Sequence, residues 1–315
     1  MRRGRTLRNL LGLEDISADD IRRLLLSAAG FKEILSRPVR KVPTLRGRAM
    51  VTLFYEASTR TRTSFEMAAK ILSAEAINVA VAQSSVTKGE SLQDTVRTLQ
   101  ALQMDCLVIR HHCSGAAEYA AKKLDVPVIN AGDGRHEHPT QGLLDLFSVC
   151  DHFDRLDTFD LRGLTLAIIG DIAHSRVARS DAWGFSKLGA KVQFAGPKTL
   201  MPGDCRSLPV TVCDDLKSGL EGAEVINVLR LQTERQERGL LPSLREYSRL
   251  WGVSGHSLQW AKPGALVMHP GPMNRGVEIS ADVADGCHSI IFDQVTHGVA
   301  VRMAVLYQLM GVEKE

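Results

Sequence analysis

Short apolar runs that alternate with segments of helical spacing constrain the fold of this chain more than any other sequence feature. The apolar runs lie at residues 49–54, 76–82, 105–110, 127–130, 164–169, 190–195, 224–229 and 265–268, and helical spacing appears at 64–73, 91–102, 116–124, 142–153, 176–188, 215–220 and 293–310. Strands that alternate with helices favour parallel sheets, joined by right-handed crossovers and covered by helices on both faces. We therefore predict an α/β protein.

The chain is long enough for two such domains. Its 315 residues exceed the usual size of a single domain, and the strand–helix pattern restarts after a polar, turn-rich segment at residues 154–163. We place one doubly wound domain at residues 1–153 and a second at residues 154–292. Because ligands of such sheets bind at the carboxyl ends of the strands, functional residues are expected in the loops that follow each strand.

The composition excludes several classes of function. The 39 Lys and Arg residues exceed the 36 Asp and Glu residues by only three, which argues against a nucleic-acid partner. No run of about 18 apolar residues is present to cross a membrane, and the basic N-terminus is not followed by the apolar segment of a secretory signal. The six cysteines form no Cys-x-x-Cys pair. We expect a cytoplasmic protein with no membrane partner, no metal and no cofactor.

The loop after the first strand contains Ser58-Thr-Arg-Thr-Arg62, at the point where a helix should begin. Backbone N–H groups at a helix N-terminus attract anions, and hydroxyl groups there add further donors. Arg60 is suited to hold a phosphate through two parallel hydrogen bonds. A simple helix cap by Ser58, supported by Glu66, is the alternative. Hydroxyls interleaved with two arginines favour the anion site.

The third strand ends with a cation beside two histidines. Arg110 is expected at the same strand-end level as Ser58, from which it could reach the same anion. His111 and His112 are adjacent in a predicted strand, so their rings should point to opposite sides. A metal ion shared by these two histidines is therefore disfavoured.

The loop after the fourth strand leads into a helix whose first turn contains His138 and Gln141. An imidazole and an amide in these positions can polarise and orient a carbonyl group without acting as nucleophiles. His136, Glu137 and His138 resemble a metal cluster only weakly, because they lie close together in one loop without a further ligand. A carbonyl-polarising site is the better interpretation.

The second domain has arginines after two of its strands. Gly170 is not followed by the further glycines of a dinucleotide-binding turn, so a pyrophosphate there would meet side chains. Arg176 opens the next helix, and Arg230 and Gln232 follow a later strand, which indicates carboxylate ligands. The two domains together predict binding of two anionic small molecules, one of them a phosphorylated acyl donor.

The segments 58–62 and 138–141 together resemble the paired signature of the aspartate/ornithine carbamoyltransferases, and the resemblance covers essentially the whole chain. Thr140 indicates the aspartate branch, because ornithine enzymes usually have cysteine there. His269-Pro-Gly-Pro272 stands where the ornithine branch has His-Cys-Leu-Pro. The chain departs from commoner family patterns at Ala57 and His112, where many members have proline, and at Gly271, which replaces a frequent leucine.

The resemblance implies the transfer of a carbamoyl group from carbamoyl phosphate to the α-amine of L-aspartate, in pyrimidine biosynthesis. It assigns carbamoyl phosphate to Ser58, Thr59, Arg60, Thr61, Arg110, His138, Gln141 and the carbonyl groups of Pro270 and Gly271, and aspartate to Lys88, Arg176, Arg230 and Gln232. Thr61, Arg110 and His138 would stabilise the negative charge that develops on the carbonyl oxygen. Glu56 would meet Arg176 or Arg235 when both substrates are bound.

The resemblance also implies an assembly. Ser84 and Lys88 would reach into the site of a neighbouring subunit, which requires a homotrimer with shared sites. A C-terminal helix, residues 293–315, would pack back on the first domain. Whether the trimer stands alone or joins a zinc-bearing regulatory chain or a dihydroorotase stays open.

Three alternatives remain from the sequence. The nearest is a carbamoyltransferase for ornithine or another amine. A non-catalytic anion-binding or assembly subunit is a second, although it would have no need of Arg60, Arg110, His138, Arg176 and Arg230 together. A nicotinamide-dependent dehydrogenase is the most distant, because of the missing glycines after Gly170.

Overall fold

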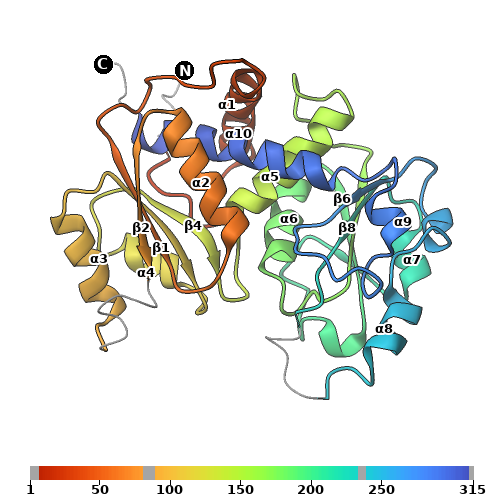
Figure 1. The fold of residues 1–315 in the computed structure, drawn as a ribbon. Coiled ribbons are helices and arrows are strands. Elements are labelled where there is room, and N and C mark those ends of the chain that lie inside the picture. The colour runs from red at the N-terminus through yellow and green to blue at the C-terminus, as the bar shows by residue number, and fades with distance from the viewer. Residues whose placement is uncertain (1–6, 81–88, 233–238, 312–315) are drawn as a thin grey trace. The chain divides into compact units, whose positions relative to one another are not determined.

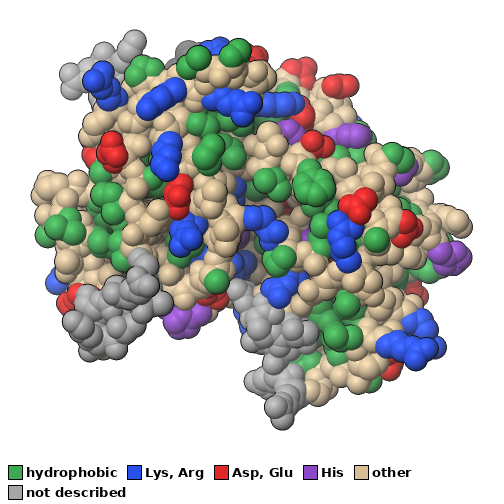
Figure 2. Space-filling model, in the orientation of Figure 1, with side chains coloured by type: hydrophobic (Ala, Val, Ile, Leu, Met, Phe, Trp, Pro, Cys, Tyr) green, Lys and Arg blue, Asp and Glu red, His purple; other side chains and the backbone are tan. Residues whose placement is uncertain are grey.

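The computed structural model describes residues 7–80, 89–232 and 239–311 (Figure 1). The chain divides into two compact units. Unit 1 comprises the residues up to Leu143 together with those from His297 onward, and unit 2 comprises Leu144–Thr296. Among the described residues, no helix combines the length and the apolar character needed to cross a bilayer. On the face drawn in Figure 2, basic side chains are interspersed with acidic and apolar ones.

Unit 1 is built on a parallel sheet of four strands in the order β2-β1-β3-β4. Its elements in chain order are α1 (Ala18–Leu35), β1 (Ala49–Phe54), α2 (Thr59–Ile71), β2 (Glu75–Ala80), α3 (Leu92–Ala101), β3 (Cys106–His111), α4 (Ala116–Ala121), β4 (Val128–Asp133) and the start of α5 (Pro139–His152). Strands β1, β3 and β4 are almost entirely buried and contribute Val51, Leu53, Leu107, Ile109 and Val128 to one apolar cluster, whereas the edge strand β2 has exposed residues. Burial on both faces is what makes parallel strands read as continuous apolar runs.

Unit 2 is built on a parallel sheet of five strands in the order β7-β6-β5-β8-β9. Its elements are β5 (Thr165–Ile169), α6 (Arg176–Lys187), β6 (Lys191–Ala195), the 3₁₀ turn η3 (Lys198–Leu200), β7 (Thr211–Cys213), α7 (Leu216–Leu220), β8 (Val225–Val228), α8 (Leu244–Trp251), η5 (Ser257–Trp260), β9 (Leu266–Met268), α9 (Ala281–Ala284) and α10 (Ile291–Met310). The core cluster joins Ile169, Ile226 and Val267 of three strands to Leu220 of α7.

The last helix continues from unit 2 into unit 1. From His297 onward it belongs to unit 1, where the ring of Tyr307 lies 5.7 Å from that of Phe31 in α1. Gln308 donates a hydrogen bond of 2.9 Å to the carbonyl of Arg23, and Arg302 lies over the ring of Phe65 in α2. This is the return of the C-terminal helix that the family resemblance implied.

The parallel sheets with flanking helices confirm the predicted fold class. Two local predictions were wrong. Helix α2 begins at Thr59 rather than at residue 64, and β4 continues to Asp133, through residues predicted to be loop. The prediction also missed α1, β7, α8 and α9. Strand β7 has only three residues, two of them exposed, so it carries no apolar run that could signal a strand.

Each sheet has one place where successive crossovers leave in opposite directions. In unit 1 this place lies between β1 and β3, because β2 is on one side of β1 and β3 is on the other. In unit 2 it lies between β5 and β8. Ligands of doubly wound folds bind at the carboxyl ends of the strands that flank such a switch point.

Candidate functional site

The switch point of unit 1 presents the N-terminus of α2. Ser58 occupies the N-cap position, but its side chain makes no capping hydrogen bond with the described residues, and the first turn contains no acidic side chain. The capping alternative for Ser58 is therefore wrong. Glu66 is not part of a cap either, since it pairs with Arg62 at 3.6 Å. The positive end of a helix dipole and its unpaired N–H groups favour negative charge, so this helix N-terminus is able to bind an external anion.

Arg110 lies at the other side of the same switch point. The register of the sheet pairs it with Phe54, the last residue of β1, so Arg110 lies near the end of its strand. The guanidinium Nε lies 3.4 Å from the carboxylate of Glu56, and Nη1 donates a hydrogen bond of 3.0 Å to the carbonyl of Ala131. Two anchors therefore hold the Arg110 side chain at the carboxyl edge of the sheet.

Glu56 was expected to meet Arg176 or Arg235. In this structure its partner within unit 1 is Arg110, and Arg235 lies outside the described residues. Ser84 and Lys88, the residues expected to serve a neighbouring subunit, also lie outside the described residues.

His138 and Gln141 lie where the sequence predicted them, directly before and within the first turn of α5. Both side chains are buried, with exposed fractions of 4% and 8%. The backbone N–H of Gln141 donates to the carbonyl of His138 at 2.9 Å, so the helix start fixes their spacing. Low exposure in this position strengthens hydrogen bonds to a developing charge.

Buried polar groups hold the loop that leads to His138. The Asn130 amide donates to Asp133 at 2.7 Å and to the carbonyl of Leu11 at 2.8 Å. Burial acts to raise the pKa of Asp133, but hydrogen bonds from His136 and Asn130 outweigh it, and the pKa of this carboxyl lies below its usual value. Asp133 therefore acts as an ionised anchor for the loop.

Glu137, directly before His138, is fully buried and accepts hydrogen bonds from the N–H groups of Leu13 at 2.7 Å and Glu14 at 3.0 Å. A Cβ added to Gly12 would collide with the same carboxylate. Glu137 forms a group with Glu14 and His136 whose ligand atoms lie within 4.8 Å of one another. Because the Glu137 oxygens already accept two backbone N–H groups, this group is better explained as an anchor than as a metal site.

Glu137→Ala is expected to lower the free energy of unfolding by about 2–4 kcal/mol, because it leaves two N–H groups without an acceptor and an unsatisfied buried donor costs about 1–3 kcal/mol. Chemical denaturation measures the change. Glu118→Ala is the matched control, since Glu118 is exposed and forms a surface ion pair with Lys122 across one helical turn, and should change stability by under about 0.5 kcal/mol. Equal effects of the two substitutions would refute the anchoring role.

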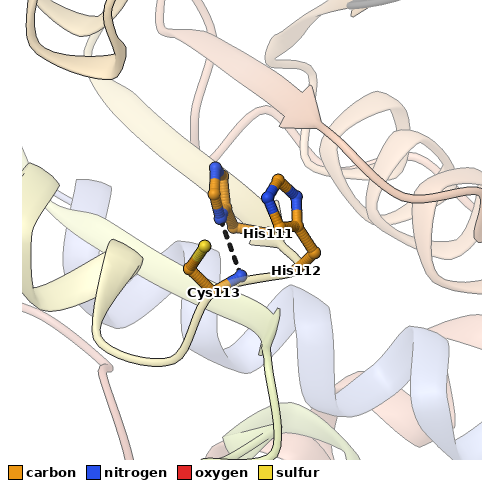
Figure 3. A group of neighbouring side chains, drawn as sticks. All are labelled: His111, His112 and Cys113. Atoms are coloured by element: carbon orange, nitrogen blue, oxygen red, sulfur yellow. Dashed lines mark hydrogen bonds between the residues drawn. The ribbon is translucent and has the colours of Figure 1, made fainter. Parts of the chain in front are cut away.

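The turn after β3 differs from the sequence prediction. The rings of His111 and His112 do not point to opposite sides but stack, with centroids 4.3 Å apart and an angle of 24° between their planes (Figure 3). The strand ends at His111 and the chain bends there, so the alternation of side chains no longer applies. Burial, followed by the neighbouring charge of His112, lowers the pKa of His111.

In unit 2, Arg176 is the first residue of α6 and is 3% exposed. Its helix starts regularly, because the Ser175 hydroxyl accepts a hydrogen bond of 3.3 Å from the N–H of Ala178. The turn from β5 to α6 requires glycine at position 170, where φ is +121° and an added Cβ would lie 2.8 Å from the Tyr247 hydroxyl. The close approach explains the lone glycine without any dinucleotide.

Asp171 connects the two sides of this second switch point. One of its oxygens lies 2.6 Å from Nδ1 of His174, and the other accepts the backbone N–H of Gln232 at 3.3 Å. Arg230 is half-buried and lies two residues beyond the end of β8. The three residues predicted to bind carboxylates, Arg176, Arg230 and Gln232, all follow the carboxyl ends of β5 or β8. Asp171 and His174 had no signal in the sequence, since nothing in their spacing indicates a contact with Gln232.

The loop after β9, which carries Pro270 and Gly271, is also in unit 2. His269 holds it: Nδ1 accepts the N–H of Gly271 at 2.8 Å, and Nε2 lies 3.3 Å from the fully buried carboxylate of Glu278. Since Nδ1 accepts, the neutral ring donates from Nε2 to Glu278. The carboxylate also accepts the N–H of Asn274. These bonds fix the path of the backbone at Pro270 and Gly271.

The geometry of both units agrees with the comparisons with known proteins. Residues 8–151 match the family described as aspartate/ornithine carbamoyltransferase, carbamoyl-P binding domain, and residues 162–309 match its Asp/Orn binding domain. The chain belongs to the aspartate/ornithine carbamoyltransferase family. The relatives most similar in sequence include the aspartate carbamoyltransferase catalytic subunit of Pelotomaculum thermopropionicum, 57% identical over 96% of this chain and 97% of that protein. The corresponding subunit of Geobacter sulfurreducens is 54% identical over 97% of each chain.

Solved structures of the carbamoyltransferase family have the same fold. Aspartate transcarbamoylase from Trypanosoma cruzi, in complex with carbamoyl phosphate and aspartate, superimposes with a TM-score of 0.85 at 30% identity, covering 96% of this chain and 97% of that one. Ornithine carbamoyltransferase from Pyrococcus furiosus superimposes with a TM-score of 0.84 at 28% identity, over 96% and 97% of the two chains. The fold alone therefore does not separate the two branches.

Proposed function

We propose that this chain is an aspartate carbamoyltransferase, which transfers the carbamoyl group of carbamoyl phosphate to the α-amine of L-aspartate. The products are N-carbamoyl-L-aspartate and phosphate, and the reaction belongs to pyrimidine biosynthesis. The observation that carries the proposal is that relatives 52–57% identical over nearly the whole chain are aspartate carbamoyltransferase catalytic subunits.

Carbamoyl phosphate binds in unit 1. Its phosphate lies at the N-terminus of α2, where it accepts hydrogen bonds from Ser58, Thr59, Arg60 and Thr61 and is joined by Arg110. The absence of a capping hydrogen bond from Ser58 to the described residues, and of acidic groups in the first turn of α2, supports this assignment. Gln141 and the carbonyl groups of Pro270 and Gly271 hold the carbamoyl amide.

L-Aspartate binds in unit 2, where Arg176, Arg230 and Gln232 hold its two carboxylates. The burial of Arg176 and the link from Asp171 to Gln232 support an ordered carboxylate site. Lys88 completes this set and, with Ser84, comes from the adjacent subunit of a homotrimer. The functional domains are residues 1–153 with 293–315 for carbamoyl phosphate and residues 154–292 for aspartate.

The reaction requires orientation and charge stabilisation. The neutral amine of aspartate attacks the carbonyl carbon, and negative charge develops on the oxygen that faces Thr61, Arg110 and His138. The tetrahedral intermediate collapses, the bond to the phosphate oxygen breaks, and the proton of the amine passes to the departing phosphate. Holding both substrates in this geometry removes the entropic cost of bringing them together.

The test is product formation from carbamoyl phosphate with L-aspartate and, in parallel, with L-ornithine. Carbamoyl-aspartate and phosphate are expected with aspartate alone. Activity with ornithine alone would move the chain to the other branch, and the similarity to the Pyrococcus furiosus enzyme makes this the necessary comparison. No product with either amine, from folded protein, would support a non-catalytic binding subunit.

Glu56→Gln tests the part that Glu56 plays. If Glu56 leaves Arg110 and meets an arginine of the aspartate site during the reaction, the substitution should raise the KM for aspartate more than it weakens carbamoyl phosphate binding. Initial rates with each substrate varied in turn measure the two effects. If the substitution weakens the response to both substrates equally, Glu56 does not move to the aspartate site. Its part would then be the contact with Arg110, which is 3.4 Å away in this structure.

A further inference from the structure

The turn after β3 places three side chains with metal-binding atoms side by side. His111, His112 and Cys113 each offer one ligand atom, and these atoms all lie within 4.8 Å of one another (Figure 3). Imidazole nitrogens and a cysteine thiolate are the ligands that zinc and similar transition metals prefer in proteins. The stacking of the two histidine rings, which the sequence did not predict, is what brings the three residues into reach of one ion.

Contacts with the loop after β4 hold this turn in place. The N–H of Gly134 donates to the carbonyl of His111 at 2.9 Å, and the N–H of Gly115 donates to Asp133 at 2.6 Å. The hydroxyl of Ser114 accepts the N–H of Arg135 at 3.1 Å. The ring of His111 is fixed further by that of Tyr55, 4.5 Å away. A metal site gains affinity when its ligands are held in position before the ion arrives.

The turn is open to an ion from solution on one side. His112 and Cys113 are exposed, whereas His111 is buried. Nδ1 of His111 accepts the N–H of Cys113 at 2.9 Å, so an ion that binds this nitrogen replaces that hydrogen bond. Three protein ligands leave the fourth tetrahedral position of zinc to water. The ion would therefore bind reversibly at the surface rather than as a part of the fold.

We propose that His111, His112 and Cys113 form a binding site for a divalent transition-metal ion of the zinc class, and that occupation of this site lowers the activity of the enzyme. The claim that the bound ion lowers activity rests on the proposed function. Arg110 directly precedes the three ligands and is held by Glu56 and by the carbonyl of Ala131. An ion that redirects the His111 ring changes the turn attached to Arg110, and its charge competes with Arg110 for Glu56.

Binding is measured on the full-length protein by equilibrium dialysis with Zn²⁺ and by the absorption of a Co²⁺ complex. The wild type is expected to bind one ion per chain, and Co²⁺ should show the charge-transfer band of a thiolate ligand. Cys113→Ser should abolish that band, and both Cys113→Ser and His112→Asn should weaken zinc binding at least about tenfold.

Cys287→Ser and His288→Asn are the matched controls, because these residues form a second exposed Cys-His pair that is not in a group of three ligands among the described residues. They should bind zinc as the wild type does. No binding by the wild type, or equal binding by Cys113→Ser, would overturn the site. These readouts do not involve catalysis, so they hold whatever reaction the chain performs.

The effect on activity is a separate measurement. Zinc at a concentration that saturates the site should lower the rate of the wild type and of Cys287→Ser but not that of Cys113→Ser. Equal inhibition of the wild type and both variants, or inhibition of none of them, would overturn the proposed coupling to Arg110. The basal rates of the variants should match that of the wild type.

Discussion

Replacing Arg110 with alanine is expected to lower kcat by about 10²–10³-fold, the usual loss when one donor to a developing oxyanion is removed. The Arg110 side chain is held by Glu56 at 3.4 Å and by the carbonyl of Ala131 at 3.0 Å. Such donors act without reorganising when the charge appears. Steady-state rates at saturating concentrations of both substrates measure the effect.

Arg62→Ala is the matched control for Arg110→Ala. Arg62 is also an arginine of the strand-end signature, but it is exposed and pairs with Glu66 along the surface of α2. Its removal should leave kcat within a few-fold of the wild type. The same small effect for Arg110→Ala would exclude Arg110 from stabilising the oxyanion. Circular dichroism of both variants checks that the fold is intact.

Arg230→Ala is expected to raise the KM for aspartate by about 10- to 100-fold, because a hydrogen bond to a charged group contributes about 1.5–3 kcal/mol and about 1.4 kcal/mol is a factor of ten. Binding of carbamoyl phosphate should be unchanged, since its phosphate is assigned to unit 1. Initial rates over a range of aspartate concentrations give the KM, and calorimetry gives the affinity for carbamoyl phosphate.

Arg249→Ala provides the comparison for Arg230→Ala within unit 2. Arg249 is an exposed residue of α8, whereas Arg230 is half-buried beyond the end of β8. The control should leave the KM for aspartate unchanged. An unchanged KM for Arg230→Ala would remove Arg230 from the aspartate site, and an equal loss of carbamoyl phosphate affinity would indicate general damage instead.

The start of α2 shows where local sequence reasoning fails. Residues 59–63 contain three threonines and two arginines, a stretch without the apolar spacing that marks a helix, and the prediction began the helix at residue 64. The structure begins it at Thr59, with Thr61 buried. The tertiary contacts of this segment outweigh the weak intrinsic helix propensity of its threonines. The earlier start places the hydroxyl groups at the helix N-terminus itself.

Some residues that shape the candidate site had no signal in the sequence. Asp171 links His174 to the backbone of Gln232, 61 positions further along the chain. Glu278 fixes the ring of His269, and Glu137 binds backbone N–H groups more than 120 positions away. Each is a polar contact between side chains or backbone groups that are not neighbours in the sequence, and hydrophobic periodicity carries no information about such pairs.

The sequence by itself determined the order of most strands and helices, the class of fold and the residues that follow the predicted strands. It could do so because strands buried on both faces need continuous apolar runs, whereas amphipathic helices need regular apolar spacing. Only the tertiary structure decided that β1 lies beside β3 and β5 beside β8, and thus which strand-end residues meet. It also decided that His111 and His112 stack. These outcomes depend on how distant segments pack and on which buried polar groups find partners, and both are properties of the folded chain.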